Sequence, residues 1–294
     1  MDNPTSGNAH VSRRDYFIFG YNISHSLSPT LHNTGFRELG LPHHFSIHET
    51  PAVDESIESI INRPEFGGAS VTFPHKLQIG SLLDSISPSA EKVGAINTIV
   101  AQGAGSERTL HGDNTDWIGI SRCIERSTDF DLKSSAGLVL GAGGAARAAC
   151  YALQTLGISE LLIVNRTLSK AEQMAAHFNG VPSRSFNTLE EASRDAKVAI
   201  WVVVACVPAD DLSKDRIPAE LFTGSETGVL VEMAYRPQVT GMMEAAADRK
   251  GWRICRGIDV LEEQAYEQFQ MWTGKPAPVK AMRTAMRMKA KGNM

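Results

Sequence analysis

Residues 136–146 read AGLVLGAGGAA, and this stretch decides the fold. Its first five residues are continuously apolar, as in a strand buried on both faces of a parallel sheet, and an apolar helical pattern follows the glycines. A strand, a turn of the form G-x-G-x-x-A and a helix together predict a dinucleotide-binding site. Glycine permits the tight turn, and the helix N-terminus attracts phosphate. The predicted cofactor-binding turn consists of Gly141, Ala142, Gly143, Gly144 and Ala145.

The end of the next predicted strand, residues 161–164, indicates which dinucleotide binds. A site for NAD usually has an acidic residue here, about 20 residues beyond the turn, for the ribose 2′-hydroxyl. This chain instead has Asn165, Arg166 and Thr167, with Lys170 close behind. Cations at this point suit the 2′-phosphate of NADP, which is therefore the predicted cofactor. The alternative is that both cations simply face solvent.

Strands and helices alternate on both sides of this stretch, which predicts an α/β fold with parallel sheets in two units. A pair of strands around a glycine turn predicts a hairpin at the edge of the first sheet, and from residue 257 onward the pattern is helical. In the last helix, Val279, Met282 and Met286 are expected to pack inward. The predicted strands of the two units are 16–20, 44–48, 69–73, 96–102 and 108–112, and then 136–140, 161–164, 198–204 and 229–233.

Composition limits the class of protein. The chain has 294 residues, of which 42% are hydrophobic, and a formal net charge of −4. These values suggest about two globular domains and argue against a nucleic-acid or membrane-surface protein, which usually has a basic face. Residues 1–15 are polar without an apolar signal segment, so they are interpreted as a disordered leader and the location as cytoplasmic.

The cysteines also exclude some classes of site. They lie far apart without C-x-x-C spacing, which favours free thiols in a reducing compartment over disulfides or a zinc site. No metal site is predicted. The four residues are Cys123, Cys150, Cys206 and Cys255.

Several polar residues of the first half stand where predicted strands meet helices. Ligands of parallel sheets bind at the carboxyl ends of the strands, so these side chains are expected to converge on one crevice. Each one alone has a structural explanation; Ser28, for example, would cap a helix. The set consists of Ser26, Ser28, Thr72, Lys76, Asn97, Thr98 and Asp116.

Taken together, these positions resemble the shikimate dehydrogenase family. The similarity extends over residues 17–278, and runs such as 67–70 and 232–235 look most similar to the dehydrogenase domain of the fungal pentafunctional shikimate-pathway polypeptide, of which this chain would be a free-standing relative. The matching motifs are SLSP with HN at 26–29 and 32–33, VTFPHK at 71–76, GAINT at 94–98, GDNTD at 112–116, GAGGA at 141–145, NRT at 165–167, YRP at 235–237 and WTG at 272–274.

The resemblance implies a domain organisation and an activity. Residues 16–117 and 258–294 would form the substrate domain, and residues 118–257 an inserted Rossmann domain that binds NADP. The implied reaction is the reversible reduction of 3-dehydroshikimate to shikimate, in the pathway of aromatic amino acid biosynthesis. The implied partners are this small-molecule substrate, with no nucleic acid or membrane, and the chain would be a monomer or homodimer.

The resemblance also implies residue roles. Ser26 and Ser28 would hold the substrate carboxylate, with Tyr235 beside it, and the Gly257 backbone would meet the nicotinamide. Lys76 is the expected proton donor and Asp116 orients it, while His25 and His75 are rival donors. The side chains expected at the substrate hydroxyls are Thr72, Lys76, Asn97, Asp116 and Gln264.

Three residues depart from the family pattern: Ser70, Val260 and Ala265 stand where Asn, Met and Gly are usual. They leave open a modified shikimate as substrate. A second alternative is a quinate dehydrogenase that uses NAD, although that enzyme would carry an acid near Asn165 or Arg166. A third alternative is a non-catalytic sensor that binds metabolites of the pathway.

Overall fold

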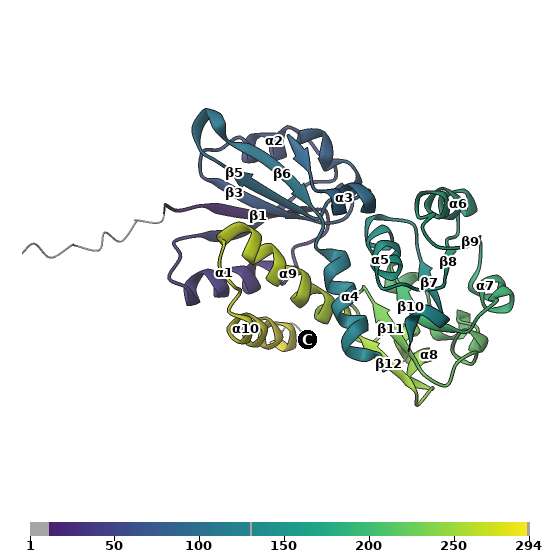
Figure 1. The fold of residues 1–294 in the computed structure, drawn as a ribbon. Coiled ribbons are helices and arrows are strands. Elements are labelled where there is room, and N and C mark those ends of the chain that lie inside the picture. Colours follow the sequence, from purple (N-terminus) through teal and green to yellow (C-terminus); the bar gives the residue numbers. More distant parts are fainter. Residues whose placement is uncertain (1–11, 130, 293–294) are drawn as a thin grey trace, which may run out of the picture.

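The computed structural model describes residues 12–129 and 131–292, which are built around two six-stranded sheets (Figure 1). Most of the predicted leader, residues 1–11, lies outside the described residues. Its predicted boundary at residue 15 is wrong by one residue, because Asp15 already belongs to the first strand and pairs with His44. Among the described residues, no helix is long and apolar enough to cross a bilayer.

The first sheet has the strand order β2-β1-β3-β5-β6-β4. Strand β1 pairs in parallel with β2 and β3, whereas β5 runs antiparallel to β3 and β6. The predicted hairpin therefore exists as β5 and β6, but it is not at the edge, since the two-residue β4 pairs outside β6. The strands are β1 (Asp15–Gly20), β2 (His44–Glu49), β3 (Phe66–Val71), β4 (Ser85–Ile86), β5 (Thr98–Gln102) and β6 (Thr109–Asp113).

Strand β3 begins three residues earlier than predicted. Its first half contains two glycines, whose backbone lies directly against aromatic side chains. A Cβ atom on Gly67 would lie 2.5 Å from the ring of Tyr16. One on Gly68 would lie 2.5 Å from the indole nitrogen of Trp272. Glycine is thus required for close approach, although it weakens the strand signal in the sequence.

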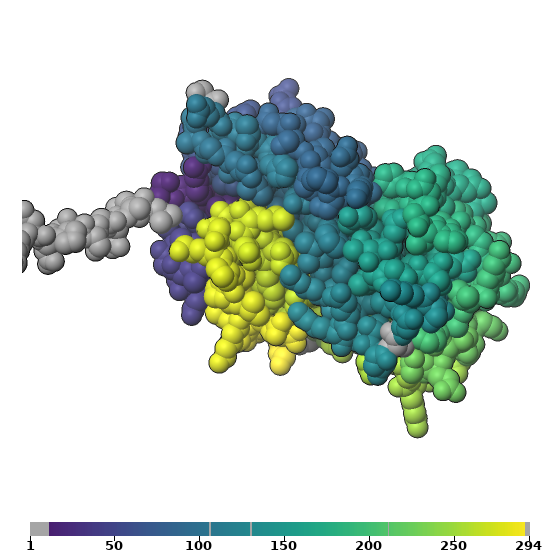
Figure 2. All heavy atoms as spheres, viewed as in Figure 1, coloured from purple at the N-terminus to yellow at the C-terminus, as the bar shows by residue number. Residues whose placement is uncertain are grey.

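Helices from both ends of the chain pack together beside the first sheet. Figure 2 shows the C-terminal helices, in yellow, between the purple N-terminal segments and the teal middle of the chain. Met282 and Met286 are fully buried as expected, but Val279 is 38% exposed, so that part of the prediction is wrong. The helices are α1 (Ser28–Glu38), α2 (Glu55–Ile61), α3 (Pro88–Val93), α4 (Asp116–Ser127), α9 (Gly257–Thr273) and α10 (Val279–Gly292).

The second sheet is entirely parallel, with the order β12-β11-β10-β7-β8-β9. Read from β9, this is the 3-2-1-4-5-6 order of a Rossmann fold. Helices α4 to α6 share one apolar cluster with it, and α7 and α8 share another, so both faces are covered. The elements are β7 (Ala136–Leu140), α5 (Gly144–Thr155), β8 (Glu160–Val164), α6 (Leu168–His177), β9 (Ser183–Phe186), α7 (Leu189–Asp195), β10 (Ile200–Ala205), β11 (Gly228–Glu232), α8 (Gly241–Ala247) and β12 (Trp252–Cys255).

Helices α4 and α9 connect the two sheets and lie against each other. A Cβ atom on Gly119 of α4 would be 2.9 Å from the backbone oxygen of Val260 of α9, so the two backbones are in close approach. Buried Glu263 of α9 accepts a hydrogen bond from Arg126 of α4 at 2.7 Å. The chain passes from one sheet to the other in α4 and returns in α9, and the contact between these helices fixes the two connections side by side. The candidate active site lies at this contact.

Candidate active site

A cavity of about 200 Å³ lies at the contact between the two sheets, and we call it the substrate cavity. It is bounded by the ends of β1, β3 and β11 and by α4 and α9. The structure brings the predicted catalytic and substrate-binding residues to this one cavity. They are Ser26, Ser28, Thr72, Lys76, Asn97, Asp116, Tyr235 and Gln264. Thr98 was expected in the same crevice, but it is fully buried and does not line the cavity, so that part of the prediction is wrong.

Lys76 and Asp116 form an ion pair in the wall of the substrate cavity. The Nζ atom of Lys76 lies 2.5 Å from Oδ2 of Asp116, and the two side chains are 14% and 9% exposed. Lys76 belongs to a single 3-10 turn that follows β3 and Pro74, and Asp116 is the first residue of α4. A positioned ammonium group that can give up a proton is thus held beside a carboxylate that fixes its direction.

Asn97 is at the centre of the hydrogen bonds around this pair. Its amide nitrogen donates to Oδ1 of Asp116 at 2.9 Å and to Oε1 of Gln264 at 3.2 Å. Its amide oxygen accepts from the backbone N–H of Thr115 at 2.7 Å and from the hydroxyl of Thr98 at 2.6 Å. Both the nitrogen and the oxygen of the Asn97 amide are hydrogen-bonded. These bonds fix Asn97, Asp116 and Gln264, which come from three separate segments, in one relative orientation.

Sequence reasoning missed Gln268, which lines the cavity one helical turn after Gln264. Its amide nitrogen donates to the backbone oxygen of Asn97 at 3.1 Å and to the hydroxyl of Thr98 at 2.9 Å. Its amide oxygen accepts from the hydroxyl of Ser70 at 2.8 Å. The i, i+4 spacing of two glutamines on one helix face was the signal that could have identified it.

Ser26, Ser28 and Tyr235 also line the substrate cavity. Ser28 is buried as the first residue of α1, and its N–H donates to Oγ of Ser26 at 3.3 Å. Ser28 is therefore not the helix cap, because Leu27 has that position. Tyr235 follows β11, and burial raises the pKa of its phenol above the ordinary value.

Neither rival proton donor lies in the substrate cavity wall. The buried ring of His75 has Nε2 3.0 Å from the backbone oxygen of Thr50, so it is engaged away from the site. His25 lies on the far side of Tyr235, in a neighbouring cavity. Burial, assisted by the Arg236 guanidinium, lowers the pKa of His25. Lys76 is the donor group that the geometry favours.

The glycine-rich turn lies where β7 and β10 adjoin, which is the point of the sheet where the strand order reverses and ligands bind. Gly141 has a φ of +113°, and a Cβ atom on it would lie 3.1 Å from the backbone oxygen of Cys206. At Gly143 an added Cβ atom would meet nothing within 4 Å. The backbone conformation at Gly141 therefore requires glycine, and the space beside Gly143 is open. A turn that binds pyrophosphate needs this open space.

The turn also reaches the substrate cavity. A Cβ atom on Gly144 would lie 2.9 Å from Cβ of Lys76, and Ala145 and Gly257 line the cavity itself. Gly257 starts α9 against the end of β11, where a Cβ atom would lie 2.5 Å from the backbone oxygen of Met233. Cofactor and substrate positions are thus contiguous around the ammonium group of Lys76.

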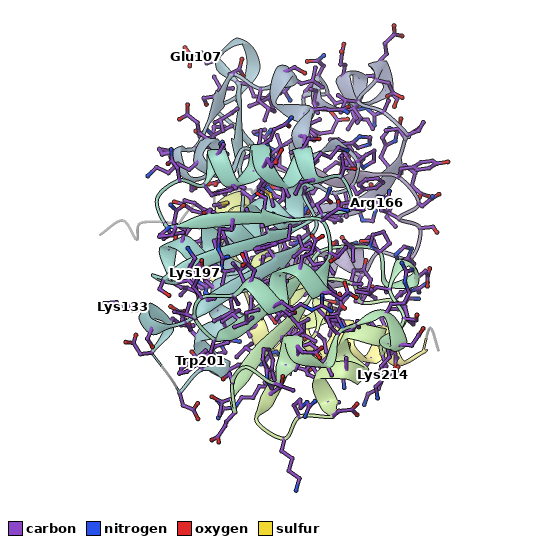
Figure 3. The ribbon with its side chains drawn as sticks, turned by 90° about the vertical axis from the view of Figure 1, so that its right-hand side faces the viewer. Glu107, Lys133, Arg166, Lys197, Trp201 and Lys214 are labelled. Carbon is purple, nitrogen blue, oxygen red and sulfur yellow. The ribbon has the colours of Figure 1, made fainter. Side chains whose placement is uncertain are left out.

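The predicted 2′-phosphate site is at the end of β8. Arg166 (labelled in Figure 3), Thr167 and Lys170 are exposed. The Asn165 amide nitrogen donates to the backbone oxygen of Thr167 at 2.9 Å. Within the described part of the chain, neither Arg166 nor Lys170 has a carboxylate within ion-pair distance. Both charges are available to a phosphate, so these residues fit NADP.

The departures from the family pattern differ in their position. Val260 and Ser70 line the substrate cavity, whereas Ala265 is packed in an apolar cluster with residues of α1 and α10. The residues that the structure describes contain no group of three or more His, Cys, Asp or Glu placed to hold a metal. All four cysteines are free thiols.

A Rossmann sheet with an open glycine turn, joined to a cavity that holds a lysine–carboxylate pair, defines the class of dinucleotide-dependent oxidoreductases. Family models narrow this class. The shikimate dehydrogenase substrate binding domain matches residues 18–99, the shikimate/quinate 5-dehydrogenase model residues 123–214, and the shikimate 5′-dehydrogenase C-terminal domain residues 257–287. The chain belongs to the shikimate dehydrogenase family.

Known proteins agree with this assignment. Shikimate 5-dehydrogenase from Thermus thermophilus, solved in complex with NADP(H) and shikimate, is 31% identical with a TM-score of 0.78, over 94% of this chain and 99% of that one. The pentafunctional AROM polypeptide of Malassezia globosa is 42% identical over 91% of this chain. The quinate repressor protein of Emericella nidulans is 35% identical over 92% of this chain. The chain spans only 17% and 34% of the lengths of these last two proteins.

Proposed function

We propose that the chain is an NADP-dependent shikimate dehydrogenase, which reduces 3-dehydroshikimate reversibly to shikimate. The observation that carries this proposal is the substrate cavity, where the Lys76–Asp116 ion pair meets both the glycine-rich turn and the predicted carboxylate-binding serines. The solved relative that binds NADP(H) and shikimate supports the same pair of ligands.

Reduction of a ring ketone needs a hydride and a proton. Bound NADPH supplies the hydride. The Lys76 ammonium group gives its proton to the carbonyl oxygen as negative charge develops there, and takes it back in the reverse direction. Asp116 accepts a hydrogen bond from Nζ of Lys76 and so directs the remaining N–H bonds into the cavity. A positioned acid–base group of this kind contributes about 10²- to 10⁴-fold in rate.

The other side chains orient the substrate. The hydroxyls of Ser26 and Ser28 would bind the carboxylate, with Tyr235 beside it, at one end of the cavity. Thr72, Asn97 and Gln264 would bind the ring hydroxyls at the other end, where Asn97 and Gln264 already share a hydrogen bond. With the ring held at both its carboxylate and its hydroxyls, one carbon of the ring would face Lys76.

The alternatives have less support. A quinate dehydrogenase that uses NAD is disfavoured by the exposed Arg166 and by the lack of an acid at the end of β8. A pure metabolite sensor is suggested by the similarity to the quinate repressor protein. It would not need an intact proton donor, yet Lys76 and Asp116 remain in contact. A modified shikimate is the alternative that Ser70 and Val260 leave to experiment.

One spectrophotometric assay separates these functions. The nicotinamide absorbance is followed with NADPH or NADH as cofactor and 3-dehydroshikimate or 3-dehydroquinate as substrate. We expect the highest kcat/KM with NADPH and 3-dehydroshikimate. A higher value with NADH and 3-dehydroquinate would establish the quinate alternative, and no turnover in any combination would contradict the proposed function.

The domain boundaries follow from the same proposal. Residues 16–117 and 258–294 would form the substrate domain, and residues 118–257 the cofactor domain. The strands support this division, since β1 to β6 make one sheet and β7 to β12 the other. The cytoplasm is the proposed location, and the four free cysteines support a reducing compartment.

A further inference from the structure

A second cavity, of about 650 Å³, lies next to the substrate cavity, and we call it the anion cavity. The same chain segments separate the two. His25 and Leu27 line the anion cavity, whereas Ser26 and Ser28 line the substrate cavity. Tyr235 lines both cavities. The wall between the two sites is therefore only one residue thick.

Two further segments also border both cavities. Ala234 and Arg236 line the anion cavity, while Met233 on the other side lines the substrate cavity. At the start of α9, Gly257 lines the substrate cavity and Ile258 the anion cavity. A ligand in the anion cavity would thus contact the backs of the segments that bind substrate.

The lining of the anion cavity is strongly basic, although the whole chain has a formal net charge of −4. Arg236, Arg256 and Lys291 come from three separate segments, and in the described residues none of the three has a carboxylate partner. Arg287 is the fourth cation of the lining, and it is held by Asp259 at 2.8 Å. The cavity therefore has three uncompensated positive charges around it.

The remaining lining shows what kind of anion fits. Leu27, Ile258 and Ala290 provide apolar surface, and the ring of Tyr235 provides an aromatic one. Arginine binds carboxylates through paired N–H groups, and the volume is in the range of small-molecule sites. A bare inorganic anion would leave the apolar surface uncovered.

We infer that the anion cavity is a second binding site, for an aromatic or cyclic polycarboxylate, distinct from the substrate cavity. Its occupancy has a consequence for the substrate. A bound polycarboxylate would put negative charge on the far side of a thin wall from the substrate carboxylate, and like charges at this separation repel. The ligand would therefore act as an inhibitor that raises KM and leaves kcat nearly unchanged.

The binding test uses benzene-1,3-dicarboxylate and isothermal titration calorimetry on the whole chain. We expect a single site whose Kd increases by about tenfold or more in the double variant Arg236→Gln/Arg256→Gln, since charge-assisted hydrogen bonds are lost. Lys291→Gln should weaken binding by a smaller factor. Lys289→Gln is the matched control, because Lys289 is an exposed lysine of the same helix outside the lining, and it should change nothing.

Three results would overturn the inference. Absence of binding, or binding unaffected by the arginine double variant, would show that the cavity is not a site. Loss of binding in Lys76→Met, a change confined to the substrate cavity, would place the probe there instead. Inorganic phosphate that binds as tightly, with the same dependence on the arginines, would show a simple oxyanion site.

The inhibition test rests on the proposed function, whereas the binding test does not. Increasing benzene-1,3-dicarboxylate should raise KM for shikimate to a plateau, because both ligands can be bound together. Direct competition for one site would raise KM without limit and would contradict the inference. If the chain had no dehydrogenase activity, calorimetry would still decide whether the anion cavity binds the probe.

Discussion

The two ends of the proposed ligand site are built in different ways. At the substrate end, Lys76, Asn97 and Asp116 are partly or fully buried and hold one another by hydrogen bonds. At the cofactor end, Arg166 and Lys170 are exposed cations on the surface of the second sheet. The substrate end is fixed before any ligand arrives, whereas the 2′-phosphate end supplies charge alone. Substitutions should therefore damage turnover at the first end and cofactor choice at the second.

A large effect, second only to that of removing Lys76 itself, is expected for Asp116→Asn. This change removes the carboxylate that orients Lys76 but keeps the size of the side chain, so kcat should fall by about 10²-fold, within the range for a lost acid–base function. Steady-state kinetics measure the effect. Asp113→Asn is the control, because the Asp113 carboxylate accepts from Ser87 at 2.6 Å outside the cavity wall. Equal losses in both variants would mean that the effect on turnover is not specific to the cavity.

A smaller effect is expected for the double variant Ser26→Ala/Ser28→Ala. Each hydroxyl contributes about 0.5–1.5 kcal/mol, so loss of both should raise KM for shikimate by roughly ten- to a hundredfold. The fall in kcat should be much smaller, because Lys76 is not affected. An unchanged KM would place the substrate carboxylate elsewhere and would break the assignment of this end of the cavity.

The cofactor end is tested by Arg166→Ala. A charge-assisted hydrogen bond to phosphate contributes about 1.5–3 kcal/mol, so the variant should lose roughly ten- to a hundredfold in preference for NADP over NAD. The loss should come from weaker NADP binding, since NAD has no phosphate there. Values of kcat/KM for both cofactors give the answer, and Lys170→Ala should lose less. A wild-type enzyme that prefers NAD would contradict the assignment of Arg166 and Lys170 to the 2′-phosphate of NADP.

A separate effect concerns stability in acid rather than catalysis, at a buried histidine near the substrate end. Burial lowers the pKa of His32 to about 3, so the folded protein keeps this ring neutral while the unfolded chain protonates it near pH 6.5. The free energy of unfolding therefore has its full value above pH 6.5 as far as His32 is concerned. It decreases as the pH falls toward 3, by up to about 1.4 kcal/mol per pH unit.

Urea unfolding at several pH values measures this slope. His32→Phe should reduce it, and His44→Gln, which removes an exposed imidazole, should not. If His32→Phe kept the wild-type slope, the buried imidazole would not be the source of the acid sensitivity.

The comparison also explains which parts of the molecule the sequence could predict. Strand β7 agrees with its prediction residue for residue, because it is continuously apolar and a glycine turn ends it at Leu140. The short strands β9 and β12 were not predicted. Their sequences, SRSF and WRIC, have no apolar run, and the two strands are defined by pairing with β8 and β11 across an intervening helix.

In the candidate active site, too, the sequence predicted the residues that stand in local motifs and missed one that depends on tertiary packing. Lys76, Asn97 and Asp116 stand in short motifs at strand ends, so local patterns and a family resemblance were enough to bring them together. Gln268 bonds to the backbone oxygen of Asn97 and to Ser70, which are far away in the sequence. Contacts of this kind depend on how α9 packs across the first sheet, which a local pattern does not contain.

The most direct test of the account separates proton transfer from binding in Lys76→Ala. We expect calorimetry to give a shikimate Kd within a few-fold of wild type, while kcat with NADPH and 3-dehydroshikimate falls by about 10²-fold or more. Turnover within a few-fold of wild type would contradict the assignment of Lys76 as the proton donor. Equal losses of binding and turnover would show that Lys76 only holds the substrate.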